Sequence, residues 1–391
     1  MTQLLEPALR AQTFPEGLYI HLPFCAAICT YCDFSSETYA AGRAQRYLTA
    51  LENEMRVRVG ALQLSEPYAP RTIFLGGGTP SALNIPELEK FFELLRRYVD
   101  WTRTAEFTIE ANPGSTDAAK LEFLLKQGVK RISFGVQSFQ PHLLKLLGRV
   151  HGADQGREAV ALARKAGYSN ISIDLMHGLP TQKRDDLRRD LDEAIALGTE
   201  HISAYGLIYE DGTPLTQAVQ RGVVGSLSEE EEGAQYTLVM ETLEQAGLPQ
   251  YEVSNYARPG FEAQHNLIYW RNEAYLGLGV SAASFVDFKR STNFYEMDRY
   301  MAAAEKDGIA IASSETLDKD ARARESLVLE LRLRRGVDAA DFARRWGLDF
   351  SQHPAIAKFM REGLMERTPE GRYRISRQGM PVADGILAEL V

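Results

Sequence analysis

Short apolar runs alternate with longer amphipathic segments from the N-terminal region to about residue 210. Runs rich in Ile, Val, Leu and Phe predict buried strands, and segments of roughly 12 to 20 residues with apolar positions three or four apart predict helices. The six predicted strands cover residues 18–22, 72–75, 106–109, 131–136, 171–175 and 201–208. Repeated βα units build a parallel sheet, which is either open or curled into a barrel.

Several helices are marked by their ends as well as by their periodicity. Residues 85–99 carry apolar side chains at helical spacing, and Gly128 is placed to end a second helix over residues 116–127. A further helix is expected from Ser228, because this residue is a good N-cap and four glutamates follow it.

The last part of the chain, from about residue 318, predicts helices followed by a hairpin at residues 363–376 with its turn at 369–371. Such a winged-helix-like α+β unit raises the possibility of DNA binding. Residues 320–391 hold 13 basic and 11 acidic side chains, a balance that favours a packing or lid module. The expected domains are a partial barrel (1–225), an extension (226–310) and a C-terminal helical and hairpin unit (311–391).

Composition narrows the functional classes. A chain of 391 residues with 45% hydrophobic and 25% charged residues is typical of a globular protein with two or three domains. A net charge of -9 argues against binding to a phosphate backbone, so nucleic acid is not an expected partner. No apolar run approaches the roughly 20 residues of a membrane span and no export signal is seen, so we expect a cytoplasmic protein.

Polar residues follow several predicted strands, and in parallel sheets the chemistry gathers at these carboxyl ends. Glu110 and Asp174 each end an apolar strand, and two acids at equivalent positions favour a shared pocket over two separate loop roles. Three glycines at 76–78 follow the second strand. We expect either bare N–H groups that bind a carboxylate or phosphate, or simply a tight turn.

All three cysteines of the chain, Cys25, Cys29 and Cys32, lie within eight residues. This spacing suits an iron-sulfur cluster, and three ligands to four irons leave one iron open to a substrate or cofactor. A zinc site is an alternative, with His21 as the nearest fourth ligand. A disulfide would leave one cysteine unpaired and needs an oxidising compartment.

The C-x-x-x-C-x-x-C run, with Tyr31 before its third cysteine, resembles the cluster motif of radical S-adenosylmethionine proteins. In that family the open iron chelates the methionine amino and carboxylate groups, and reductive cleavage yields a 5'-deoxyadenosyl radical. Further motifs are similar to the anaerobic coproporphyrinogen oxidase group: YIHLPFC at 19–25, FLGGGTP at 74–80, EANPG at 110–114, GVQS at 135–138 and DLMHGLP at 174–180.

This resemblance implies an α/β fold with a partial (β/α)6 barrel and a [4Fe-4S] cluster on the three cysteines. Matched residue by residue, it implies S-adenosylmethionine contacts from Tyr19, Tyr31, Gly77, Gly78, Thr79, Glu110, Gln137, Arg149 and Asp174. Some of these contacts belong to a second S-adenosylmethionine in the oxidase, so one or two sites are possible.

Two departures separate the chain from the oxidase. Phe34 stands where the oxidase has a further cysteine, and only 24 residues precede Cys25. In addition, HNLIYW at 265–270 resembles the signature of the haem-chaperone branch of the same family. The resemblance implies haem contacts from His265, Tyr269 and Trp270, since histidine is a common axial ligand and aromatic rings pack on a porphyrin. The alternative is a core histidine beside two buried aromatic residues.

Together these features predict a haem chaperone that binds haem, a [4Fe-4S] cluster and S-adenosylmethionine. The resemblance implies delivery of haem to respiratory haemoproteins, an electron donor such as flavodoxin or ferredoxin, and membrane association only through partners. One alternative is the oxygen-independent coproporphyrinogen III oxidase of porphyrin biosynthesis, which decarboxylates its substrate to protoporphyrinogen IX. Another is a non-catalytic metal-binding interaction protein.

Overall fold

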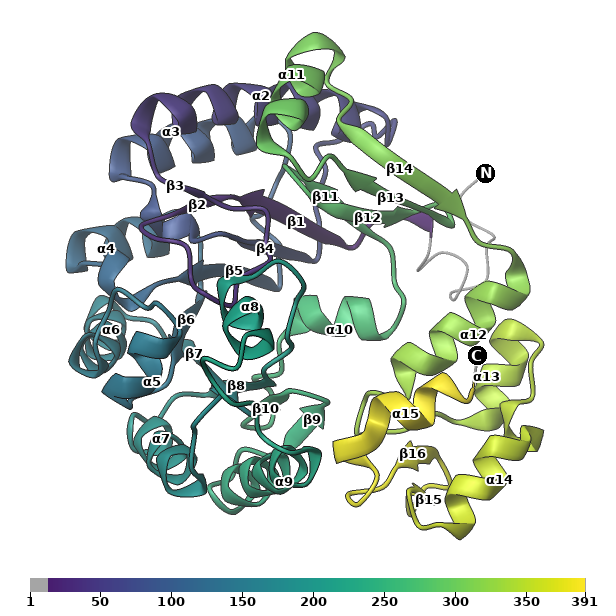
Figure 1. Ribbon diagram of the computed structural model, residues 1–391. Coiled ribbons are helices and arrows are strands. Elements are labelled where there is room, and N and C mark those ends of the chain that lie inside the picture. Colours follow the sequence, from purple (N-terminus) through teal and green to yellow (C-terminus); the bar gives the residue numbers. More distant parts are fainter. Residues whose placement is uncertain (1–12, 391) are drawn as a thin grey trace.

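The computed structural model describes residues 13–390, and its main feature is a twelve-stranded sheet that curls into an open arc (Figure 1). Six parallel strands form the middle of the sheet. They are β1 (Gly17–Leu22), β4 (Thr72–Gly77), β5 (Glu106–Ala111), β6 (Arg131–Gln137), β7 (Asn170–His177) and β8 (His201–Gly206). Both ends of each strand lie within two residues of the ends of a predicted strand, so the predicted partial barrel is confirmed.

Later segments of the chain extend both edges of this sheet. At one edge β11 pairs in parallel with β1, and β12, β13 and β14 continue in antiparallel order. At the other edge β10 and β9 follow β8. Their bounds are β9 (Gln250–Glu252), β10 (Asn255–Ala257), β11 (Tyr275–Leu278), β12 (Ala283–Val286), β13 (Lys289–Asn293) and β14 (Ile311–Thr316). The expected divisions near residues 225 and 310 therefore fall within one continuous sheet.

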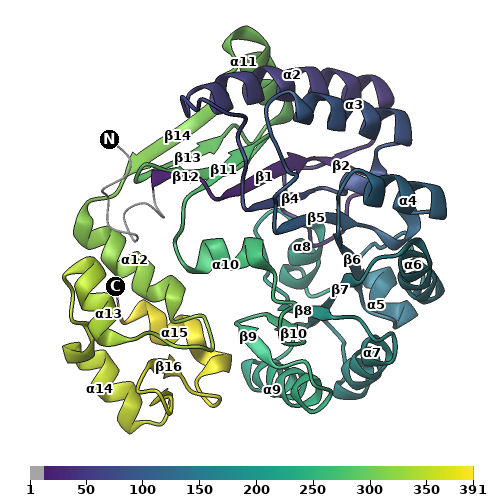
Figure 2. The same ribbon diagram turned by 180° about the vertical axis from the view of Figure 1, so that it is seen from behind.

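Helices cover the outer face of the arc, as both ribbon views show (Figures 1 and 2). They are α2 (Ala41–Gly60), α3 (Ile85–Arg96), α4 (Ala118–Lys126), α6 (Ala153–Ala166), α7 (Arg184–Ala196), α9 (Glu229–Gln245) and α11 (Met297–Asp307). Their ends follow the expected signals: Ser228 accepts a hydrogen bond from the N–H of Glu231, and Gly128, in the left-handed region, follows α4. Strands buried on both faces need this outer layer.

The inner, concave side of the arc holds the helix α10 (Gln264–Trp270), which lies between the sheet and the C-terminal unit (Figures 1 and 2). That unit contains the predicted helices and hairpin. Its elements are α12 (Lys319–Glu330), α13 (Ala339–Trp346), η4 (Phe350–Gln352), α14 (Pro354–Arg361), β15 (Met365–Arg367), β16 (Tyr373–Ile375), η5 (Met380–Val382) and α15 (Ala383–Ala388). Phe342, Trp346, Phe350 and Tyr373 pack together as its aromatic core.

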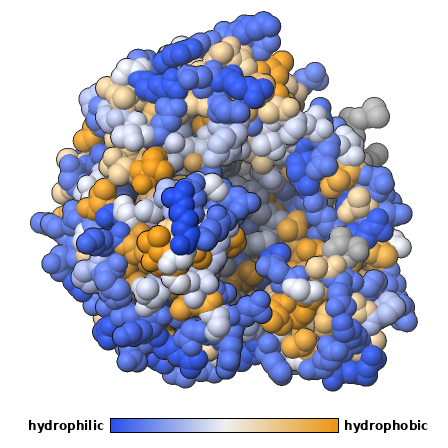
Figure 3. Space-filling model, in the orientation of Figure 1, coloured by the Kyte–Doolittle hydropathy of each residue, from blue (hydrophilic) through white to orange (hydrophobic). Residues whose placement is uncertain are grey.

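The space-filling view, in the orientation of Figure 1, shows a hollow near the centre of the molecule with apolar side chains beside it (Figure 3). Short elements line the carboxyl ends of the strands: β2 (Phe24–Cys25), β3 (Glu37–Thr38), η2 (Pro80–Ala82), η3 (Pro113–Ser115), α5 (Pro141–Leu146) and α8 (Pro214–Gln220). Within residues 13–390, no helix combines the length and the apolar character needed to cross a membrane.

Candidate functional site

The three cysteines and the strand-end residues line one cavity of about 380 Å³ at the carboxyl ends of the parallel strands. The cysteines lie on the segment between β1 and α2, so the chain brings them over the strand ends. All but one of the predicted S-adenosylmethionine contacts line this cavity: Tyr31, Gly77, Gly78, Thr79, Glu110, Gln137, Arg149 and Asp174. Tyr19 lies away from the cavity lining, on β1, where its ring stacks on Phe74 at 6.2 Å between centroids.

The segment around Cys25 is held by backbone hydrogen bonds to two other segments. The N–H groups of Gly78 and Thr79 donate to the carbonyls of Leu22 and Phe24, at 3.0 and 2.8 Å. The N–H of Tyr39 donates to the carbonyl of Cys25 at 2.8 Å. The glycine run therefore fastens the cysteine segment to the end of β4.

These bonds bear on the two alternatives for the glycine run, which were bare N–H groups for a ligand or a tight turn. The N–H of Gly77 also has an internal partner, Oε2 of Glu110 at 3.2 Å. The glycines serve close packing instead. Gly77 has a φ of +111°, and a Cβ there would lie 2.5 Å from the His21 ring, while a Cβ on Gly78 would lie 2.6 Å from the carbonyl carbon of Pro23.

Polar groups approach two of the thiols. Nη1 of Arg149 donates to Sγ of Cys29 at 3.2 Å, and Nη2 donates to the carbonyl of Gly135 at 2.5 Å. Oγ1 of Thr79 lies 3.5 Å from Sγ of Cys25. Burial raises the pKa of the Cys25 thiol, so in the absence of a metal this sulfur favours its neutral form.

The alternatives for the cysteines lose support. All three are free, so none is in a disulfide. His21, the candidate fourth zinc ligand, donates from Nε2 to the carbonyl of Ser35 at 2.8 Å and accepts at Nδ1 from the Tyr19 hydroxyl at 3.2 Å. Among residues 13–390 no three His, Cys, Asp or Glu side chains are arranged to hold a single metal ion. A cluster differs, because its thiolates bind separate irons.

Two carboxyl groups, at the ends of the strands on either side of β6, give the cavity an affinity for cations. Burial, and then the nearby Asp174, raise the pKa of Glu110 to about 8. Burial also raises the pKa of Asp174, which accepts a hydrogen bond from Oγ of Ser133 at 3.0 Å. A positively charged ligand would favour the ionised form of both acids, because its charge offsets the effect of burial.

Backbone strain occurs at the same edge of the sheet. Gln137, which lines the cavity, has a φ of +69°, and the register between β6 and β7 shifts between Gly135 and Gln137. Such irregularity often aims a side chain at a functional site. Phe34, Met176 and Tyr205 also line the cavity, although none of them was among the predicted contacts. The strand-end rule points to Tyr205, which stands near the end of β8.

The predicted haem residues lie apart from the cysteine cavity, on α10. His265 is buried, and its Nδ1 and Nε2 lie 2.7 Å from Oγ1 of Thr72 and 2.8 Å from the hydroxyl of Tyr269. Burial lowers the pKa of His265 to about 3, so the ring is neutral. Trp270 has a different environment, with the Arg332 guanidinium 5.6 Å from its ring centroid.

Comparison with known proteins places this site in a family. Residues 19–194 match the Radical SAM superfamily, and residues 317–382 match the HemN C-terminal domain. The heme chaperone HemW of Bacillus subtilis is 35% identical over 366 residues, which are 93% of this chain and 96% of that protein. The chain belongs to the HemW family of radical SAM proteins.

Other relatives extend the comparison. The heme chaperone HemW of Escherichia coli is 38% identical over 284 residues, covering 70% of this chain and 71% of that protein. The solved structure of coproporphyrinogen III oxidase (HemN) from Escherichia coli, described as a radical SAM enzyme, superposes with a TM-score of 0.85. The match covers 98% of this chain and 92% of that one at 23% identity, so it shows a common fold.

Proposed function

We propose that this HemW family member is a haem chaperone, which binds haem together with a [4Fe-4S] cluster and S-adenosylmethionine and delivers haem to respiratory haemoproteins. The observation that carries this proposal is the relation to HemW of Bacillus subtilis over nearly the full length of both chains. The cavity that joins three free thiols to two buried acids supports the cofactors. A cytoplasmic location, where thiols stay reduced, suits such a site.

In this proposal Cys25, Cys29 and Cys32 hold the cluster. Their side chains border one cavity, and the guanidinium of Arg149 donates a hydrogen bond to Sγ of Cys29. A bound cluster would supply one electron to the sulfonium of S-adenosylmethionine. An electron donor such as flavodoxin or ferredoxin would have to approach this end of the barrel.

S-adenosylmethionine is proposed to bind in the same cavity, beside the two acids at the strand ends. Its ammonium and sulfonium groups are cations, and Glu110 and Asp174 offer carboxylates at the ends of β5 and β7. Gly77, Gly78, Thr79, Gln137, Arg149 and Tyr31 complete the proposed contacts around the cavity. Tyr19 would act through its hydrogen bond to His21, since it does not line the cavity.

Haem is proposed to bind at α10. Tyr269 and Trp270 supply aromatic surface for a porphyrin, and His265 supplies an imidazole. For His265 to bind iron it must give up its hydrogen bond to Thr72 or to Tyr269. Haem binding by this residue is therefore expected to be accompanied by a local change at the start of α10.

Haem titration tests this assignment. Replacing His265 with Ala should weaken haem binding and change the absorption spectrum of the complex. The matched control is His201→Ala, because His201 is also buried inside the barrel, with its nitrogens 2.8 and 3.0 Å from Ser172 and Tyr251. Equal haem affinity and spectra for wild type and His265→Ala would remove this histidine from the site.

Metal analysis tests the cluster and separates the proposal from a metal-binding interaction protein. Anaerobically reconstituted protein should contain four irons with acid-labile sulfide per chain, and Cys29→Ser should lose them. Stoichiometric zinc without sulfide would instead support the non-catalytic alternative.

A second candidate is oxygen-independent coproporphyrinogen III oxidase, and the fold shared with HemN is the observation in its favour. Phe34, which is exposed at the edge of the cavity, stands where the resemblance implies a fourth cysteine in that enzyme group. Reconstituted protein given coproporphyrinogen III, S-adenosylmethionine and reductant should form no protoporphyrinogen. Product formation at enzymatic rates would reverse the assignment.

A further inference from the structure

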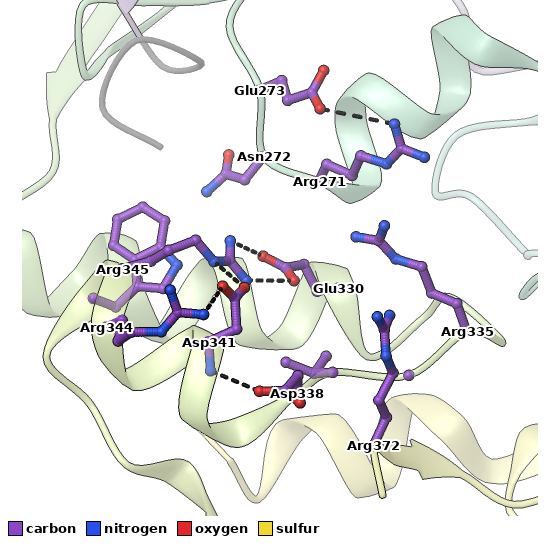
Figure 4. A pocket seen from close by; sticks show the side chains of 13 residues that line it. Arg271, Asn272, Glu273, Glu330, Arg335, Asp338, Asp341, Arg344, Arg345 and Arg372 are labelled. Atoms are coloured by element: carbon purple, nitrogen blue, oxygen red, sulfur yellow. Dashed lines mark hydrogen bonds and ion pairs between the residues drawn. The ribbon is translucent and has the colours of Figure 1, made fainter. Parts of the chain in front are cut away.

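A second cavity, of about 690 Å³, lies between the end of α10 and the C-terminal unit, away from the cysteines (Figure 4). Its walls come from three segments: residues 271–273 after α10, residues 330–346 from the end of α12 through α13, and Arg372 between β15 and β16. Five arginines line it, which is unusual for a chain with a net charge of -9.

On one wall the charges satisfy one another. Arg345 donates to both carboxylate oxygens of Glu330, at 2.8 and 3.0 Å, and its Nε donates to Asp341 at 3.0 Å. Arg344 donates to the same Asp341 at 2.9 Å. Asp338 is used as well, because it accepts the N–H of Asp341 at the start of α13. Both arginines of this wall, Arg344 and Arg345, are therefore paired with carboxylates of the chain.

The other wall is different. Within residues 13–390 the side chains of Arg335 and Arg372 make no hydrogen bond or ion pair. Arg271 lies 3.9 Å from Glu273, whose carboxylate is also paired with Arg71, and its Nε is buried without a hydrogen-bond partner. Figure 4 shows these three guanidinium groups one after another along one side of the cavity. We call Arg271, Arg335 and Arg372 the arginine wall.

The arginine wall stands on rigid supports. Val337 and Tyr373 exchange backbone hydrogen bonds at 2.7 and 2.9 Å, which ties the turn bearing Arg335 to the hairpin bearing Arg372. Gly336 has a φ of +71°, and a Cβ there would lie 2.7 Å from the carbonyl oxygen of Tyr373. The two segments that bear Arg335 and Arg372 are therefore held next to each other.

Holding three like charges together with only the distant carboxylate of Glu273 beside them costs free energy that an anionic ligand would recover. Guanidinium groups bind carboxylates through paired hydrogen bonds. The indole of Trp346 adds an apolar surface, and its Nε1 is buried without a hydrogen-bond partner in the described chain. The cavity is thus suited to a flat ligand that carries more than one acid group.

Given the proposed haem function, on which this step rests, we infer that the arginine wall binds the two propionate carboxylates of haem. Arg271 directly follows Trp270, so the same helix end contributes to the proposed porphyrin contact and to the acid contact. The wall would set the orientation in which haem enters and leaves α10, and the C-terminal unit would form half of the haem site.

The test compares two ligands on the full-length protein. Ferric haem and a haem whose two propionates are converted to primary amides are titrated into wild type, Arg335→Gln and Arg372→Gln. Wild type should bind haem at least tenfold more tightly than the diamide. Each variant should weaken haem about fivefold or more and leave the diamide affinity unchanged. Arg299→Gln on α11, where an exposed arginine pairs with Glu296, is the charge-matched control.

The outcomes are distinguishable. Equal affinity of wild type for haem and diamide would overturn the arginine wall as the propionate site while leaving haem binding in place. Arginine variants that weaken the binding of haem and of the diamide equally would also overturn the arginine wall as the propionate site. Failure of wild type to bind either ligand would overturn the proposed haem function and this inference with it. Circular dichroism of the variants confirms folding, and the comparison of ligands on wild type does not depend on any variant.

Discussion

Replacing Glu110 with Gln should stabilise the cluster-free protein at alkaline pH and weaken its binding of S-adenosylmethionine. Burial and Asp174 raise the pKa of Glu110 from an ordinary value of 4.5 to about 8. The folded protein therefore keeps a proton that the unfolded chain releases between these two values. The stability that this proton provides is fully present below pH 4.5 and is lost as the pH rises through about 8.

The magnitude follows from the size of the shift. Each pKa unit corresponds to about 1.4 kcal/mol, but the Glu110 carboxyl faces a cavity that solvent reaches, so the full value is too large. We expect the wild type to lose about 1–3 kcal/mol of unfolding free energy between pH 5 and pH 8.5 through this group. Glutamine keeps the hydrogen bond from the N–H of Gly77 and cannot ionise. Glu110→Gln should therefore match the wild type at pH 5 and exceed its stability at pH 8.5.

The assay is denaturant unfolding of cluster-free protein at both pH values, with Glu93→Gln, an exposed carboxylate on α3, as the control. The affinity of Glu110→Gln for S-adenosylmethionine should fall at least tenfold, because one buried carboxylate no longer faces the cationic ligand. Calorimetric titration of the reconstituted protein with S-adenosylmethionine measures this loss. A stability difference between Glu110→Gln and wild type that is the same at pH 5 and pH 8.5 would refute the electrostatic reasoning, and unchanged affinity would refute the ligand assignment.

Two further changes test the cysteine cavity. Arg149→Met removes the hydrogen-bond donor to Sγ of Cys29, so the reduction potential of the reconstituted cluster should become more negative. An anaerobic redox titration followed by electron paramagnetic resonance measures this potential. A potential equal to that of the wild type would contradict the expected role of Arg149. Gly77→Ala places a Cβ 2.5 Å from His21 in a left-handed conformation, so it should cost about 2 kcal/mol or more in unfolding free energy. Gly42→Ala, in α2 with open space around it, should lose no stability in the same denaturation experiment.

The central fold could be predicted because its signals are local. Each parallel strand is an apolar run between amphipathic helices, as at β6, and the caps that start α3 and α9 stand in the sequence. The edges of the sheet could not be predicted in the same way. β11 joins β1 although the two are separated by most of the chain, and β9 has three residues, so neither carries a pattern that specifies its partner.

The candidate site shows the same division. Glu110 and Asp174 were predicted together, because the end of a strand fixes where its side chain lies in the sheet. The hydrogen-bond partners of Gly78 were not predictable, because they depend on the carbonyls of a segment that crosses over the strand ends. Arg335 and Arg372 carried no motif at all, and their proximity arises only when the hairpin packs on the turn after α12.

The hydrogen bonds that fasten the cysteine segment have a consequence for how the protein acquires its metal. The carbonyls of Leu22, Phe24 and Cys25 are engaged by the neighbouring backbone, and the N–H of Thr30 donates to the carbonyl of Leu147. The loop is thus shaped by the chain itself and does not wait for iron to order it. Iron-sulfur assembly factors would meet a loop that already has its final conformation. The same loop should resist proteolysis even before the cluster is inserted.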